Sequence, residues 1–121
     1  MHPDVLAYIT SAPPALQDAL RDLRSLIVNA YIDAEEGMYA GKFPQYTQGD
    51  KIVCSFALRA KGIMLYLCDD ETVTRYEPQL GKLVSGKACV LYKETRTLKA
   101  AQLRHIVKEM LREAADKRAQ T

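Results

Sequence analysis

Residues 52–67, which read IVCSFALRAKGIMLYL, decide the fold class of this chain. In the first half of this stretch every second residue lies on the same face of a strand, namely Ile52, Cys54, Phe56 and Leu58. We expect this face to point inward. Ala60-Lys61-Gly62 is a turn signal, and a second apolar run follows at residues 63–67. Two strand-like runs joined by so short a turn predict an antiparallel hairpin.

The segment before this hairpin predicts helices and a strand. A short helical turn or two comes first, and a longer helix follows, whose apolar residues recur at helical spacing: Leu16, Leu20, Leu23, Ile27 and Ala30. This helix ends before Gly37. Residues 38–46 then predict a strand beside the hairpin, broken or bent near Gly41 and Pro44.

The segment after the hairpin predicts a short helix, a strand and a long helix. Asp69 or Asp70 is placed to cap the short helix over about residues 71–80, and residues 87–93 read as the strand. Thr97 is placed to cap the last helix, whose core stripe consists of Leu103, Ile106, Val107, Met110 and Ala114. This order of elements predicts an α+β domain, in which an antiparallel β-sheet has the N-terminal and C-terminal helices packed on one face.

Length and charge limit the classes of protein to consider. The 121 residues suit a single domain over residues 1–121. The net charge of +2 makes nucleic-acid binding an unfavoured function. No apolar run approaches the roughly 20 residues of a membrane span. The N-terminus lacks the pattern of a secretory signal, so a cytoplasmic location is expected. The three cysteines, which are odd in number and widely spaced, predict buried, reduced thiols.

Two acidic clusters are candidate metal ligands. They lie after the first long helix and at the start of the short helix, and together they offer Glu35, Glu36, Asp69, Asp70 and Glu71. Converging carboxylates are hard oxygen ligands that suit iron, manganese or magnesium. The alternative is a pair of solvated helix ends, since a helix N-terminus favours negative charge. The metal hypothesis therefore requires that the two clusters meet in space.

A second candidate site combines tyrosine and lysine near the predicted strand ends: Tyr39, Lys42, Tyr46, Lys87 and Tyr92. Strand ends and their loops often carry binding residues on a rigid scaffold. Lysine charge and tyrosine hydroxyls could together hold a small anionic molecule. The alternative is that the tyrosines pack at the edge of the core while the lysines face solvent.

The sequence favours a binding module over an enzyme. No nucleophile, base and orienting group can be placed together from it. A protein-interaction role is a further alternative, with a homodimer built on an exposed strand edge or on the last helix.

Five features of the chain together carry a resemblance to a known family. They are Ala34-Glu35-Glu36 after the first long helix, the segment from Tyr39 to Pro44, Lys61-Gly62-Ile63 in the hairpin, the stretch from Gly81-Lys82 through Gly86-Lys87-Ala88-Cys89-Val90, and the amphipathic last helix. Over nearly its full length the chain resembles the YdhG-like family of small bacterial domains, mostly of unknown function. Some members are described as frataxin-like intracellular iron chaperones. The resemblance therefore implies that the carboxylate clusters bind iron.

Overall fold

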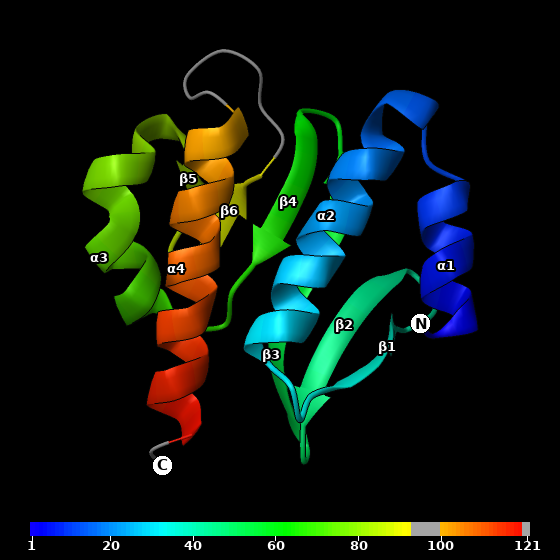
Figure 1. The fold of residues 1–121 in the computed structure, drawn as a ribbon, viewed down its shortest axis with the longest axis horizontal. Helices are drawn as coiled ribbons and strands as arrows, with labels where there is room; N and C mark the ends of the chain where they lie inside the picture. Colours follow the sequence, from blue (N-terminus) through cyan, green and yellow to red (C-terminus); the bar gives the residue numbers. More distant parts are fainter. Residues whose placement is uncertain (93–99, 120–121) are drawn as a thin grey trace.

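The computed structural model of the protein describes residues 1–92 and 100–119. Within these residues six strands form one antiparallel sheet, in the order β1-β2-β3-β4-β6-β5 (Figure 1). The strands are β1 (Glu35–Tyr39), β2 (Phe43–Gln48), β3 (Lys51–Arg59), β4 (Gly62–Tyr66), β5 (Val84–Ser85) and β6 (Cys89–Leu91). The helices are α1 (Pro3–Thr10), α2 (Pro14–Ala30), α3 (Asp70–Leu80), the 3₁₀ turn η1 (Gly81–Leu83) and α4 (Ala100–Ala119).

The central hairpin forms as the sequence predicts. β3 and β4 pair antiparallel, with Ser55 opposite Tyr66 and Leu58 opposite Ile63. The turn between them consists of Ala60 and Lys61. The predicted antiparallel α+β architecture is therefore confirmed from its centre outward.

The prediction that Ile52 faces inward is wrong. Tyr46 of β2 lies opposite Cys54, but the next residue, Thr47, lies opposite Ile52, so Val53 is an extra residue in β3. One extra residue reverses the alternation of side chains beyond it. Val53 and Cys54 are consequently both buried, while Ile52 is 37% exposed.

Residues 38–46 form parts of two strands instead of one bent strand. Ala40 and Gly41 both have positive φ, 49° and 71°, and turn the chain back on itself. Two such residues in succession match the tight turns that right-twisted hairpins favour. Pro44, expected near a break, instead lies inside β2 opposite Met38. This second hairpin places Tyr39 directly across from Phe43.

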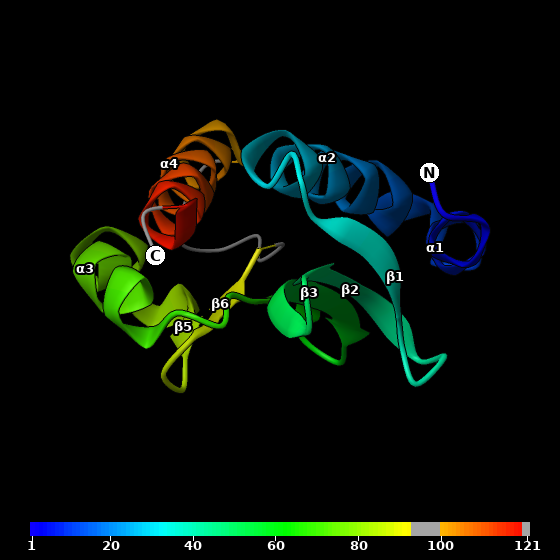
Figure 2. The same ribbon diagram turned by 90° about the horizontal axis from the view of Figure 1, so that it is seen from below.

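The helices lie against one face of the sheet. Figure 2 shows α1, α2 and α4 on the same side of it, and α3 packs beside α4. The expected stripe of α4 is confirmed, with Ile106 half-buried and the other four members buried. Asp69 caps α3 as expected, by accepting a hydrogen bond from the Thr72 backbone N–H. The predicted cap Thr97 lies outside the described residues.

Two further expectations concern the burial of the cysteines and the absence of a membrane-spanning segment. All three thiols are free, but only Cys54 is buried, while Cys89 is half-buried and Cys68 is exposed. The expectation of three buried cysteines is therefore wrong for two of them. None of the described helices combines the length and the apolar character that crossing a membrane requires.

Among the described residues, no helix covers the opposite face of the sheet, which we call the open face (Figure 2). Alternation along the strands assigns to it Gly37, Tyr39, Phe43, Gln45, Ser55, Ala57, Arg59 and Tyr66. Ala57 is fully buried although it is not part of the hydrophobic core cluster. The middle of the open face is therefore shielded from solvent, although no described helix lies on it.

Candidate functional site

Glu36 is the centre of a polar network on the covered face. Its carboxylate accepts hydrogen bonds from Arg24 Nε at 2.8 Å and from the Tyr46 hydroxyl at 2.7 Å. The backbone N–H of His2 donates a further bond at 2.8 Å. Burial raises the pKa of Glu36, but the bonds from Arg24, His2 and Tyr46 together outweigh burial and hold this pKa below its usual value. The network ties the N-terminus, α2, β1 and β2 together.

Tyr92 makes a similar connection farther along the sheet. Its hydroxyl donates a hydrogen bond to Asp22 of α2, and Arg104 of α4 donates to the same carboxylate at 2.8 Å. Burial, followed by the bond to Asp22, raises the pKa of Tyr92, so the hydroxyl stays protonated. This cluster joins the end of β6 to the two long helices.

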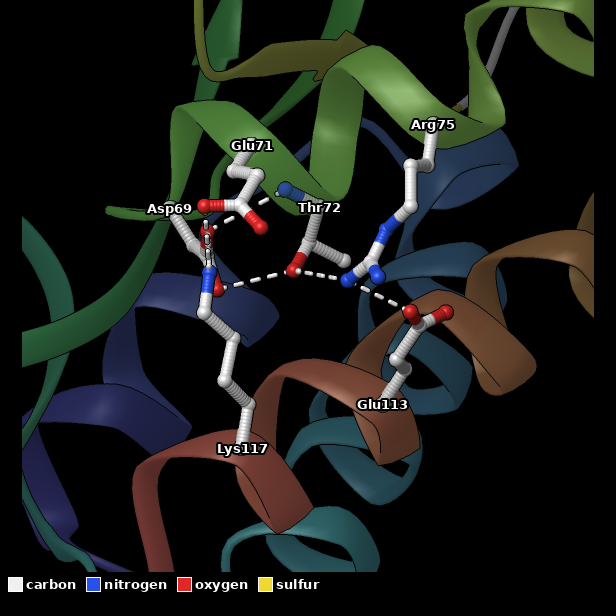
Figure 3. A network of polar contacts seen from close by, with 6 residues as sticks. All are labelled: Asp69, Glu71, Thr72, Arg75, Glu113 and Lys117. Carbon is white, nitrogen blue, oxygen red and sulfur yellow. Dashed lines mark hydrogen bonds and ion pairs between the residues drawn. The ribbon is translucent and has the colours of Figure 1, made fainter. Parts of the chain in front are cut away.

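The Asp69 cluster clamps α3 against α4, as Figure 3 shows. Asp69 accepts hydrogen bonds from the Thr72 backbone and hydroxyl at 3.1 and 2.8 Å, and from Lys117 Nζ at 3.1 Å. Lys117 also lies 3.5 Å from Glu71. Arg75 and Glu113 form a second ion pair between the helices at 2.5 Å. Each carboxylate of this ion-pair set is thus matched by a cation.

The two predicted metal clusters do not meet. Glu35 and Glu36 lie on the edge strand β1, whereas Asp69, Asp70 and Glu71 lie at the start of α3, which follows β4 and lies toward the opposite edge of the sheet (Figures 1 and 2). Within the described residues no group of three or more His, Cys, Asp or Glu side chains could hold a metal ion. Iron binding therefore stays a prediction of the family resemblance, for which the fold supplies no convergent ligand set.

The predicted tyrosine and lysine site is also divided. Tyr46 and Tyr92 are buried, and their hydroxyls bond the carboxylates described above. Lys87 lies in the β5–β6 turn, which antiparallel pairing places at the opposite end of the sheet from Lys42 in the β1–β2 turn. Of the five residues, only Tyr39 and Lys42 belong to one local surface.

That surface holds an aromatic–arginine cluster, which consists of Tyr39, Phe43, Arg59 and Tyr66. The rings of Tyr39 and Phe43 stack with centroids 5.1 Å apart, and the Phe43 and Tyr66 centroids are 6.2 Å apart. The guanidinium carbon of Arg59 lies 5.5 Å from the Phe43 centroid and 5.6 Å from that of Tyr66. Arg59 Nε also donates a hydrogen bond to the Tyr66 hydroxyl at 2.8 Å. Four side chains from four strands are therefore held together on the open face.

The charged residues in and beside the two turns next to this cluster are all cations. The β1–β2 and β3–β4 turns lie at the same end of the sheet, which we call the hairpin end. Lys42 and Lys61 lie in these turns, and Arg59 is the last residue of β3, directly before the β3–β4 turn. Residues 37–48 and 52–68 contain no aspartate or glutamate. None of the ion pairs found among the described residues includes any of the three cations.

Reasoning from the sequence missed Phe43, Arg59, Lys61 and Tyr66. The available signal was the outward half of each strand pattern, because residues that alternate with the core share the other face. Two facts were needed to use it: the tight turn at Ala40 and Gly41, and the resulting register of β2 against β3.

The fold and this surface together define an α+β domain with a six-stranded antiparallel sheet, which in the described residues has helices on one face only. Among solved structures, the chain is similar to YdhG from Bacillus subtilis, a protein of the DUF1801 family, with a TM-score of 0.65. The similarity covers 93% of both chains at 14% sequence identity, so it establishes a shared fold. The YdhG-like architecture expected from the sequence is confirmed. No family model matches the chain, and no curated protein matches it.

Proposed function

We propose that the protein is a non-enzymatic binding domain for a small anionic ligand, which binds the open face at the hairpin end. The observation that carries this proposal is the surroundings of the Arg59 side chain. Its guanidinium rests on two aromatic rings, and the described residues offer it no carboxylate partner.

The setting of Arg59 suits it to an incoming anion. Only its Nε donates a hydrogen bond in the described structure, so its terminal amino groups keep their donors. A guanidinium binds carboxylate or phosphate oxygens through paired N–H donors. The Phe43 and Tyr66 rings and the Tyr66 hydroxyl hold the side chain in place before the anion arrives. Less side-chain freedom is then lost on binding, which favours affinity.

Lys42 and Lys61 extend the positive field around Arg59. Both side chains are exposed in tight turns, where a flexible lysine can follow the position of an anion. Because such exposed charges are screened by salt, the affinity should fall as ionic strength rises. This proposal retains Tyr39 and Lys42 from the sequence prediction and replaces the other three residues.

Titration of the labelled protein with inorganic pyrophosphate, followed by nuclear magnetic resonance, tests the proposal. We expect saturable shifts of backbone amides in residues 39–43 and 59–62. Arg59→Ala should weaken binding at least about tenfold, since a hydrogen bond to a charged group contributes about 1.5–3 kcal/mol. Lys42→Ala should weaken it less.

Lys87→Ala is the matched control. This residue is also an exposed lysine in a hairpin turn, but at the other end of the sheet. It should leave the affinity unchanged. Binding that responds equally to Lys87→Ala and Lys42→Ala, or shifts confined to other parts of the chain, would contradict the proposal.

A further inference from the structure

Tyr39 is a stacking surface with one neighbour. Its ring lies against Phe43 with an angle of 24° between the ring planes, yet the residue remains 46% exposed. An exposed aromatic ring that is already held by a stacked neighbour loses little freedom when a further planar group packs on it. Stacking of a nucleic-acid base on an aromatic side chain contributes about 1–3 kcal/mol.

Gly37 leaves room beside this ring. It lies two residues before Tyr39 on the same face of β1, and a Cβ atom added there would meet nothing within 4 Å. Its φ is outside the positive region that favours glycine. Neither steric crowding nor backbone conformation therefore requires glycine here. Glycine inside a strand otherwise weakens it and often marks a place where a ligand approaches the backbone.

Gln45 lies directly across from Gly37. Its Oε1 is buried and has no hydrogen-bond partner, and it is the one such side-chain atom within the described residues. An unpaired buried acceptor costs about 1–3 kcal/mol, so the amide gains by turning toward an N–H donor. Rotation of the amide toward the open space over Gly37 would bring Oε1 to such a donor. The edge of an adenine ring offers both a donor and an acceptor to a glutamine amide.

We infer that the anionic ligand is a nucleoside phosphate, whose base lies over Gly37 against Tyr39 with its edge toward Gln45. Its phosphate lies on Arg59 and Lys42. Strands β1 and β3 are two positions apart in the sheet, about 10 Å. Gly37 is in line with Ser55 of β3, and Arg59 lies farther along that strand, but its side chain reaches back to the rings of Phe43 and Tyr66, where the phosphate would meet it. The small net charge of +2 favours a single nucleotide over a nucleic-acid strand. This inference rests on the proposed function and names its ligand class.

Three probes separate the two proposals: adenosine monophosphate, ribose 5-phosphate and adenosine. The first two carry the same phosphate and differ in the ring. If the inference is correct, adenosine monophosphate binds at least about tenfold more tightly than ribose 5-phosphate, in line with one stacked base. Equal binding of these two would overturn the inference and leave the anion site standing. If adenosine monophosphate, ribose 5-phosphate and pyrophosphate all fail to bind, both proposals fail.

Gly37→Val tests the position of the base. The Cβ atom of the new side chain meets nothing within 4 Å, and valine is a residue that strands favour, so the fold should be retained. It should abolish the preference for adenosine monophosphate while ribose 5-phosphate still binds. Thr47→Val, farther along β2 on the same face, is the control and should keep the preference.

Two further readouts make the test independent of that single variant. Tyr39→Ser should also remove the preference for adenosine monophosphate over ribose 5-phosphate. Gln45→Ala should reduce the difference in affinity between adenosine monophosphate and uridine monophosphate. Circular dichroism and amide spectra confirm that each variant is folded. A preference that survives in folded Gly37→Val and Tyr39→Ser would place the ring elsewhere and overturn the inference. If oligonucleotides bind more tightly as their length increases, the ligand is a nucleic-acid single strand and the inference of a single nucleotide is wrong.

Discussion

The two faces of the sheet hold the same kinds of side chain in different electrostatic settings. On the covered face, Arg24 and Tyr46 meet at the carboxylate of Glu36. On the open face, Arg59 and Tyr66 meet each other directly, with aromatic rings and no carboxylate beside them in the described structure. The carboxylate therefore makes the difference: the first arginine is satisfied by the protein, and the second keeps donors for a ligand.

This comparison separates stability from binding. A partly buried ion pair with several hydrogen bonds is costly to break, because the remaining charge is left without a partner. An exposed cation on an aromatic ring contributes little to folding, about 0.5–1 kcal/mol. Substitutions on the covered face should therefore change the free energy of unfolding, whereas those on the open face should change affinity.

The largest effect is expected for Glu36→Ala. The side chains of Glu36 and Arg24 are only 12% and 19% exposed, so the variant leaves a mostly buried guanidinium and the Tyr46 hydroxyl unpaired. We expect a loss of about 2–4 kcal/mol in the free energy of unfolding, measured by urea denaturation. The exposed neighbour gives the control, since Glu35→Ala should change stability by less than about 0.5 kcal/mol. Equal effects of the two variants would mean that the network is not structural.

The pH dependence of stability sharpens the same point. The pKa of Glu36 is lower in the folded state than the ordinary value of 4.5, so its ionised form stabilises the fold above that value. This contribution is lost as the pH falls below 4.5 through the depressed pKa of the folded state. Glu36→Gln should therefore unfold more easily than wild type at pH 7 and show a shallower loss of stability in acid. Parallel urea curves at pH 7 and at about pH 3 check this prediction. An unchanged acid dependence would contradict it.

Arg59→Ala is the corresponding test on the open face. It removes the guanidinium from the Phe43 and Tyr66 rings, and we expect at most about 1 kcal/mol of lost stability. The same variant should lose most of the pyrophosphate affinity. A large loss of stability with unchanged affinity would reverse our assignment of the two faces.

The smallest effect is expected between α3 and α4. Arg75 and Glu113 form an ion pair with 50% and 34% of their side chains exposed. Exposed pairs of this kind contribute little, so Arg75→Ala should change the free energy of unfolding by less than about 0.5 kcal/mol. The change should vanish at 1 M salt, where exposed charges are screened. A loss comparable with that of Glu36→Ala would show that this surface is more than a solvated contact between helices.

Local sequence patterns were enough to predict most helices and strands, but they were not enough to predict the candidate site. The β3–β4 hairpin, the Asp69 cap and the stripe of α4 each depend on neighbouring residues, and each formed as predicted. The extra residue at Val53 was not visible in the apolar pattern, because Ile52 and Val53 are both apolar strand formers. The carboxylate clusters looked equivalent in sequence, although one is bonded to Arg24 and the other to Lys117.

The sequence by itself determined most of the helices and strands and the antiparallel α+β class, because periodicity and turn chemistry are properties of adjacent residues. Only the tertiary structure decided which tyrosines face the core. Tyr39 and Tyr46 occupy similar strand positions, yet the turn at Ala40 and Gly41 and the pairing of β2 place one on the open face and bury the other against Glu36. A one-residue change in register reverses the face of every side chain in a strand, so the location of the site follows from the pairing of the strands.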